Sequence, residues 1–208
     1  MFNIMSINEN QLVDLWTTYT GFLHRLDDQN LNQMLETLSD RLIMATQALK
    51  KDDPYCGPGG LLKYSIDSFR TANKILKALE TDIWDASRKT IAVITLLAPL
   101  GRIGDLENEQ FIEQKSDWHR DKLGQLYDWN PACQKMSTPH RTLFLLQHFG
   151  VKISQEEQIG ILCSSGMHLD ENRFYLHDIP LNVRLCLMAF DFAYENEKYK
   201  TKQGSQNI

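Results

Sequence analysis

The segment IAVITLLAPLGRIGD, from Ile91 to Asp105, is an apolar run that ends in a proline and a glycine-rich turn. Its apolar part, Ile91–Leu100, is shorter than the roughly 20 residues that a membrane-spanning helix needs. The run therefore predicts a buried helix. We expect this helix to end at Ala98 and Pro99, because proline has no N–H to donate within a helix. A loop then follows from Gly101 to about Ser116.

Apolar residues recur at three- and four-residue steps over most of the chain, a spacing typical of amphipathic helices. The expected helices cover residues 6–26, 30–51, 61–79, 84–98, 117–130, 140–150, 154–166 and 181–199. Candidate caps are Ser6 or Asn8, Asp85, the Ser154–Glu157 capping box and Gly150. The segment at 169–180 is predicted to be a loop or short hairpin. The fold class is all-α, in one compact domain with an N-terminal helical pair.

Composition limits the function classes. The chain has 208 residues, 42% of them hydrophobic and 24% charged, which is ordinary for a protein with a packed core. The net charge of -5 makes nucleic-acid binding an unfavoured function, because phosphate backbones attract basic proteins. Four widely spaced cysteines form no C-x-x-C pair, so a zinc knot is not expected. The first ten residues lack a signal-peptide pattern, and we expect a cytoplasmic protein without a membrane anchor.

Three segments together resemble one family. They are GPGGLLKYS at residues 57–65, ITLLAPLGRIGD at 94–105, and MSTPHRTLFLLQHFGVKISQEEQIGILCSSGM at 136–167. In order and spacing they resemble the HD-domain metal-dependent phosphohydrolases, particularly the small members from large tailed phages and bacteria. The resemblance covers roughly residues 54–194. It implies an HD-like helical bundle at 53–196, after an N-terminal extension at 1–52 that packs on it and before a flexible tail at 197–208.

Most positions that carry metal ligands in that family hold other residues here. Tyr64 stands in place of a histidine, Ala98 and Pro99 replace the His-Asp doublet, and Ser164 replaces a later histidine. An earlier family histidine falls near Pro54. Only His140 and Asp191 keep the expected ligand types. Alanine and proline offer no donor atom, and a phenol or hydroxyl is a poor substitute for imidazole. We therefore expect no HD-type hydrolysis, no bound metal and no cofactor.

A relocated metal site is the alternative in which the protein remains an enzyme. Asp67 follows Tyr64 by three residues, and Asp105 closes the glycine-rich turn. With His140 and Asp191 these carboxylates would make a ligand set. The simpler interpretation is that both aspartates are solvated or cap local turns.

A segment rich in cations and aromatic residues suggests a different use for the cleft. KSDWHRDKLGQLYDWN, at residues 115–130, offers Lys115, Trp118, His119, Arg120 and Lys122. Cations pair with phosphate and aromatic rings stack on bases, so this combination suits a nucleotide. The interleaved Asp117 and Asp121 also fit an ordinary solvated helix face.

Further ligand-binding candidates come from the positions that the resemblance marks. They are Tyr64, His140 and Asp191, and the cations Arg102 and Arg141 could add to the same site as the cation-aromatic segment. Asp191 lies within an apolar helical pattern, so we expect it to be buried with a partner such as His140 or Arg102. Either pair is also compatible with a purely structural role.

Two functions of different classes follow. The first is a catalytically inactive HD-fold protein that binds, and thereby sequesters, a phosphorylated small molecule such as a nucleotide or cyclic oligonucleotide. A phage protein of this kind, in the host cytoplasm, would counter a host defence signal. The second is an interaction scaffold, with a protein partner or a homo-oligomer. Its contact face would be formed by the N-terminal helices through Leu12, Trp16, Tyr19, Leu23, Met34 and Leu38.

Overall fold

The computed structural model describes residues 8–79, 87–175 and 177–206, and it is mostly helical. The expected all-α class is confirmed. The larger helices are α1 (Glu9–Leu23), α2 (Gln29–Thr37), α4 (Gly60–Ala78), α5 (Arg88–Leu97), α7 (Thr138–His148), α8 (Gln155–Cys163) and α10 (Leu181–Gln206). Short elements are η1 (His24–Leu26), α3 (Ser39–Met44), η2 (Ala98–Ile103), β1 (Phe111–Glu113), α6 (Asp117–Leu123), β2 (Tyr127–Trp129) and α9 (Asp170–Arg173).

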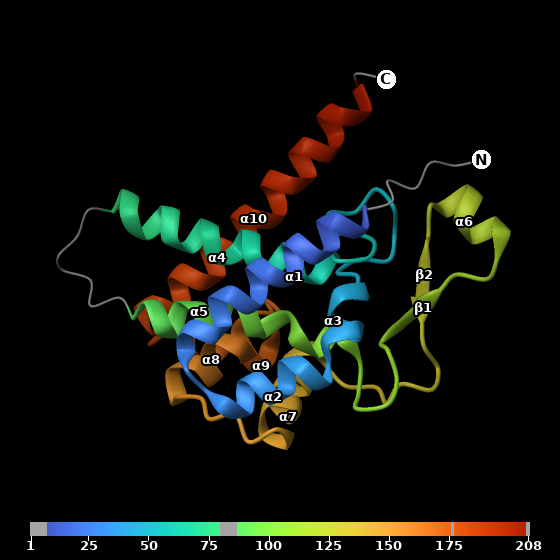
Figure 1. The fold of residues 1–208 in the computed structure, drawn as a ribbon. Helices are drawn as coiled ribbons and strands as arrows, with labels where there is room; N and C mark the ends of the chain where they lie inside the picture. The colour runs from blue at the N-terminus through green and yellow to red at the C-terminus, as the bar shows by residue number, and fades with distance from the viewer. Residues whose placement is uncertain (1–7, 80–86, 176, 207–208) are drawn as a thin grey trace.

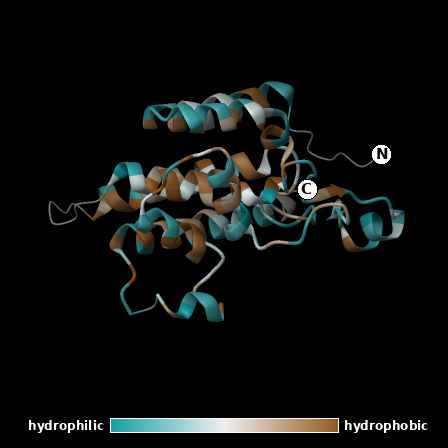
Figure 2. Cartoon of the chain, turned by 90° about the horizontal axis from the view of Figure 1, so that it is seen from below, coloured by the Kyte–Doolittle hydropathy of each residue, from teal (hydrophilic) through white to brown (hydrophobic). Residues whose placement is uncertain are grey.

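Helix α5 is the centre of the fold. Every residue from Thr90 to Leu97 is buried, as the apolar run predicted. The hydroxyl of Ser87 caps the helix by accepting a hydrogen bond from the N–H of Thr90. Helices α1, α4, α8 and α10 pack around α5 (Figure 1), and the apolar residues gather in the middle of the molecule (Figure 2). The expected start of this helix, with Asp85, lies outside the described residues, as does Ser6.

The N-terminal helices belong to this same core. The phenol of Tyr19 donates a buried hydrogen bond of 3.0 Å to the carbonyl oxygen of Leu96. Tyr19, Leu23, Met34 and Leu38 are all buried in one cluster with α5 and α10. In the scaffold alternative this face would be exposed or dimerising, but these four of its six residues are buried. Its apolar side chains already have a partner in α4 and α5.

The helix expected at 30–51 is broken. α2 ends at Thr37, α3 ends at Met44, and the chain then runs without a helix to Gly60. Leu38 leaves helical geometry where its side chain enters the core. The hydroxyl of Thr46 then accepts a hydrogen bond from the N–H of Gly57. Core packing and bonds to distant backbone outweigh the local helical pattern.

Pro99 converts the end of α5 into the 3-10 helix η2, and two further residues fix the turn that follows. A Cβ on Gly101 would lie 2.2 Å from the carbonyl oxygen of Thr138, so only glycine lets α7 approach this closely. Gly104 has a φ of 104°, which favours glycine. The hydroxyl of Thr142 accepts from the N–H of Gly101 and donates to the carbonyl of Ala98. The expected loop from Gly101 therefore begins as a packed turn.

Strands β1 and β2 pair antiparallel and carry α6 between them, forming an arm (residues 111–129) that stands out from the body (Figure 1). The helix expected over 117–130 ends at Leu123, because Gly124 adopts the left-handed conformation and terminates it. Next to α6, the arm bonds to the segment before α4: the N–H of Leu126 donates to the carbonyl of Leu49 over 2.8 Å.

The last helix is longer than expected. α10 continues to Gln206 through the segment for which we expected a flexible tail. Ion pairs at helical spacing, Lys198 with Glu195 and Lys200 with Glu197, support these turns. At 169–180 the structure places the short helix α9. No helix among the described ranges is both long and apolar enough to cross a membrane.

Candidate functional site

The strongest candidate site is a hollow between α3, η2 and the base of the arm. We call it the Arg102 hollow. It has a volume of about 210 Å³. Its walls are formed by Asp40, Arg41, Met44, Ala45, Thr46, Arg102, Ile103, Glu109, Gln110, Phe111 and Tyr127. Two guanidinium groups and two aromatic rings therefore meet in one small space.

Arg102 has no polar partner among the described residues. Its guanidinium carbon lies 5.8 Å from the ring centroid of Phe111, a cation–π contact, and no carboxylate or carbonyl accepts its hydrogens. Burial lowers the pKa of Arg102, while the nearby phenol of Tyr64 raises it. A guanidinium carries five donors and is costly to bury unpaired. The arrangement leaves those donors for an anion from outside the chain.

Tyr64 on α4 lies close enough to Arg102 to interact electrostatically. Burial raises the pKa of Tyr64 above its usual range, Arg102 lowers it and Asp191 raises it further. The phenol therefore stays protonated at neutral pH. Its ring packs against Tyr55 and Phe190, at centroid distances of 5.1 and 5.7 Å. Tyr64 fills the space between α4 and α10 with an aromatic ring.

The wall of the hollow also contains two acidic residues, a second arginine and a second tyrosine. Asp40 and Glu109 stand at the exposed rim, whereas Arg41 and Arg102 are partly buried. Glu109 already has a partner, because its carboxylate lies 3.5 Å from Nε of Arg41. Burial raises the pKa of Tyr127 to about 12, so this second phenol is also a neutral donor. Arg41 is paired with Glu109, so Arg102 is the cation of this wall that has no carboxylate partner among the described residues, and Asp40 also lines the hollow.

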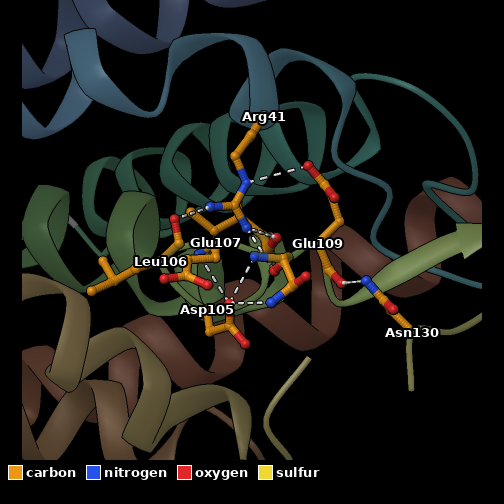
Figure 3. Close-up of polar contacts among 8 residues, drawn as sticks. Arg41, Asp105, Leu106, Glu107, Glu109 and Asn130 are labelled. Carbon is orange, nitrogen blue, oxygen red and sulfur yellow. Dashed lines mark hydrogen bonds and ion pairs between the residues drawn. The ribbon is translucent and has the colours of Figure 1, made fainter. Parts of the chain in front are cut away.

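Arg41 holds the loop that follows η2 (Figure 3). Its Nη atoms donate to the carbonyl oxygens of Ile103, Leu106 and Asn108, at 3.0, 3.2 and 2.7 Å. Within the loop, Oδ1 of Asp105 accepts from the N–H groups of Glu107 and Asn108. Asp105 is thus a loop cap, as the simpler interpretation of the sequence held.

Arg141 fastens the same loop from α7. Its buried guanidinium donates to the carbonyl oxygens of Gly101 and Gln134 and to the side chain of Gln110. Arg141 was a ligand candidate from sequence, but all these donors are directed to the protein. It supports the backbone at Gly101, one residue before Arg102.

The residues of the cation-aromatic segment lie elsewhere. Lys115, Trp118, His119, Arg120 and Lys122 are on the arm, and none of them lines the Arg102 hollow. Arg120 donates to the carbonyl of Gln114 and pairs with Asp117. Helix α6 contains no buried residue, so its charges form a solvated face.

His140 occupies a second, separate hollow of about 170 Å³ between α7, α8 and α9. It is exposed, and its Nδ1 lies 2.6 Å from the hydroxyl of Ser137 at the start of α7. Asp191 is also exposed, so the expectation that it is buried with His140 or Arg102 is wrong. Its helix turns this side chain to solvent. The ten sequence candidates therefore divide among several places.

The residues at the positions of the family's metal ligands do not fit a metal ion. Tyr64 is enclosed by aromatic rings, Ala98 and Pro99 are buried without donors, and His140 is in the other hollow. Within the described part of the chain, no three His, Cys, Asp or Glu side chains group in a way that could hold a metal. Asp67 instead accepts from Lys63 and Tyr55. The relocated set is not assembled.

Sequence reasoning named Tyr127 only as an aromatic surface of the cation-aromatic segment, and it missed the wall residues Arg41 and Phe111. Arg41 lies in what was expected to be a continuous helix, and Phe111 and Tyr127 come together only through strand pairing. No local signal identifies them.

Comparison with known proteins supplied no relative: no family model, no curated protein and no solved structure matches this chain.

Proposed function

We propose that this protein binds a phosphorylated small molecule in the Arg102 hollow and does not hydrolyse it. The observation that carries the proposal is the guanidinium of Arg102, which is mostly enclosed and has no partner among the described side chains. Phosphate oxygens suit such a fork of donors, because each guanidinium can give two parallel hydrogen bonds. Sequestration is the role that follows from binding without turnover.

The size of the hollow favours a small ligand. At about 210 Å³ it is below the roughly 300–1,000 Å³ of sites for drug-sized molecules. One phosphate on Arg102, with a sugar or base against Phe111 and Tyr127, is the ligand class that we favour. A cyclic oligonucleotide would have to extend over the rim, where Asp40 and Glu109 oppose a second phosphate.

The test is ligand-dependent melting of the purified protein with inorganic phosphate, mononucleotides, dinucleotides and cyclic oligonucleotides. A ligand that binds the folded state raises the melting temperature by mass action. We expect a mononucleotide to give the largest shift, and chromatography to recover it unchanged. We expect Arg102→Met to abolish the shift.

The matched control is Arg184→Met, which removes an exposed arginine of α10 outside the hollow. The ligand should raise the melting temperature of this variant by the same amount as that of the parent protein. Absence of a shift with every phosphorylated compound would overturn the proposal. If the ligand raised the melting temperature of Arg102→Met as much as that of the parent protein, the binding site would lie outside the hollow.

A further inference from the structure

One side of α10 carries large apolar side chains that are exposed in the part of the chain that the structure describes. Phe192 is 58% exposed and Tyr199 is 64% exposed, and Leu181 and Met188 are exposed as well. Their spacing of seven, four and seven residues keeps all four on one side of the helix. The adjoining side, with Leu185, Ala189 and Ala193, is buried in the core. We call the exposed side the α10 stripe.

The helix projects where this stripe continues. Lys63 on α4 pairs with Glu197 over 2.8 Å, and beyond that point α10 extends outward from the body (Figure 1). At 1.5 Å per residue, the helix is about 39 Å long. A projecting helix with an apolar side resembles one half of a helix pair.

The charged residues beside the stripe indicate which partner helix would fit it. Asp191, Glu195, Lys198 and Lys202 follow one another at steps of four, three and four residues, so they form a row along one flank of the stripe. Read along the helix, the row is acidic, acidic, basic, basic. A parallel copy would place like charges together. An antiparallel copy reads basic, basic, acidic, acidic, and every charge then meets its opposite.

We infer that two copies of this chain pair in antiparallel orientation through the outer part of their α10 stripes, from Phe192 to Tyr199. A single register satisfies both pairs of charges. Asp191 lies opposite Lys202 of the second copy and Glu195 lies opposite Lys198, because each pair has its midpoint between Asn196 and Glu197. Phe192 and Tyr199 share that midpoint to within one residue, so the two rings meet across the pair. In an antiparallel helix pair, each flank of one helix lies against the same flank of the other. The row of charges requires this arrangement.

The first measurement is molar mass by light scattering or sedimentation over a range of micromolar concentrations. We expect the mass to rise to twice 24.1 kDa as concentration increases. The matched pair of variants is Lys198→Glu and Lys200→Glu, which make the same change two residues apart on different sides of the helix. Lys198→Glu should weaken the dimer at least tenfold, whereas Lys200→Glu should leave it unchanged.

Charge-reversed variants distinguish a loss of pairing from a loss of folding. The variant D191K/E195K makes the row wholly basic, and K198E/K202E makes it wholly acidic, so each should be monomeric alone. An equimolar mixture should form a heterodimer, because each basic row then meets an acidic one. Recovery on mixing shows that both variants were folded.

Three results would overturn the inference. They are a protein that stays monomeric at every concentration, a dimer that Lys198→Glu does not weaken, and reversed variants that fail to pair when mixed. Ligand binding at Arg102 should be the same in the monomeric variants, so the outcome of this experiment is independent of the proposed function.

Discussion

Arg141 and Gly101 are joined by a buried hydrogen bond of 3.1 Å between the Nη1 of the arginine and the glycine carbonyl. This bond ties α7 to η2 one residue before Arg102. The same guanidinium also bonds Gln110 and Gln134, so one side chain unites three segments that are distant in sequence. The position of Arg102 therefore depends on a neighbour whose hydrogen bonds go to other parts of the protein.

Replacing Arg141 with methionine should lower the free energy of unfolding by about 3 kcal/mol, because buried acceptors lose charged donors. Denaturant unfolding monitored by circular dichroism measures this change. The same variant should bind the ligand of the Arg102 hollow more weakly, since η2 is no longer held. A loss below about 0.5 kcal/mol would contradict the role assigned to Arg141, because that is the scale of ordinary surface substitutions.

Arg102→Met should have the opposite effect on stability. Arg102 is partly buried without a polar partner among the described residues, so methionine removes a partly desolvated charge while it keeps much of the packing against Phe111. We expect the free energy of unfolding to rise by up to about 1 kcal/mol, as in other sites where function opposes stability. Marked destabilisation would mean that the guanidinium has a structural partner, and would count against the proposed site.

Gly101→Ala tests the close approach of α7. The added Cβ would meet the backbone of Thr138 and Thr142, at 2.2 and 2.9 Å, and neither can move as a flexible side chain can. We expect a loss of about 3 kcal/mol or more in chemical denaturation. Gly21→Ala is the matched control in α1, where a Cβ meets nothing within 4 Å. That change should stabilise the protein by about 0.5–1 kcal/mol, since alanine favours a helix.

Asp105 should make the protein sensitive to acid. Burial alone raises the pKa of this carboxyl, but hydrogen bonds from the backbone of Gln134, Asn108 and Glu107 outweigh it and the pKa is lowered overall. A depressed pKa in the folded state contributes stability above the unfolded value of 3.8, and this contribution is lost as the pH falls further.

The measurement is unfolding by denaturant from pH 6 to pH 3. We expect Asp105→Asn to flatten the decline in stability on the acidic side of this range relative to the parent protein. Asp170→Asn changes a carboxylate whose side chain is 89% exposed, and it should leave the decline as it is. Parallel curves for Asp105→Asn and the parent would contradict the assignment.

The sequence predicted the parts of the fold that depend on local chemistry. The apolar run at 91–97 is a buried helix, Ser154 and Glu157 form the expected capping box, and Gly150 follows α7 in the left-handed conformation. Each follows from side chains within a few residues of one another. The two breaks in the helix expected at 30–51 could not be predicted in this way, because Leu38 enters the core and the chain after Met44 bonds to Gly57.

The candidate site was predictable only in part, for the same reason. The motif pointed to Arg102 and Tyr64, which do interact. Arg41, Phe111 and Tyr127 reach the hollow through a break between helices and through strand pairing, neither of which leaves a local pattern. Asp191 was misjudged because an apolar helical pattern does not reveal which side of the helix remains in solvent.

The arm is the segment at which we expect a protease to cut the chain while the rest of the protein stays folded. α6 has seven residues, fewer than the roughly 12–15 at which isolated helices become marginally stable in water, and none of them is buried. Lys115, Arg120 and Lys122 therefore offer trypsin a segment that can open locally while the core stays intact. The two fragments produced by such a cut would remain joined, because η2 from the first half packs on α7 from the second. A chain that is severed at the arm should thus migrate as one particle in its native state and as two pieces once denatured.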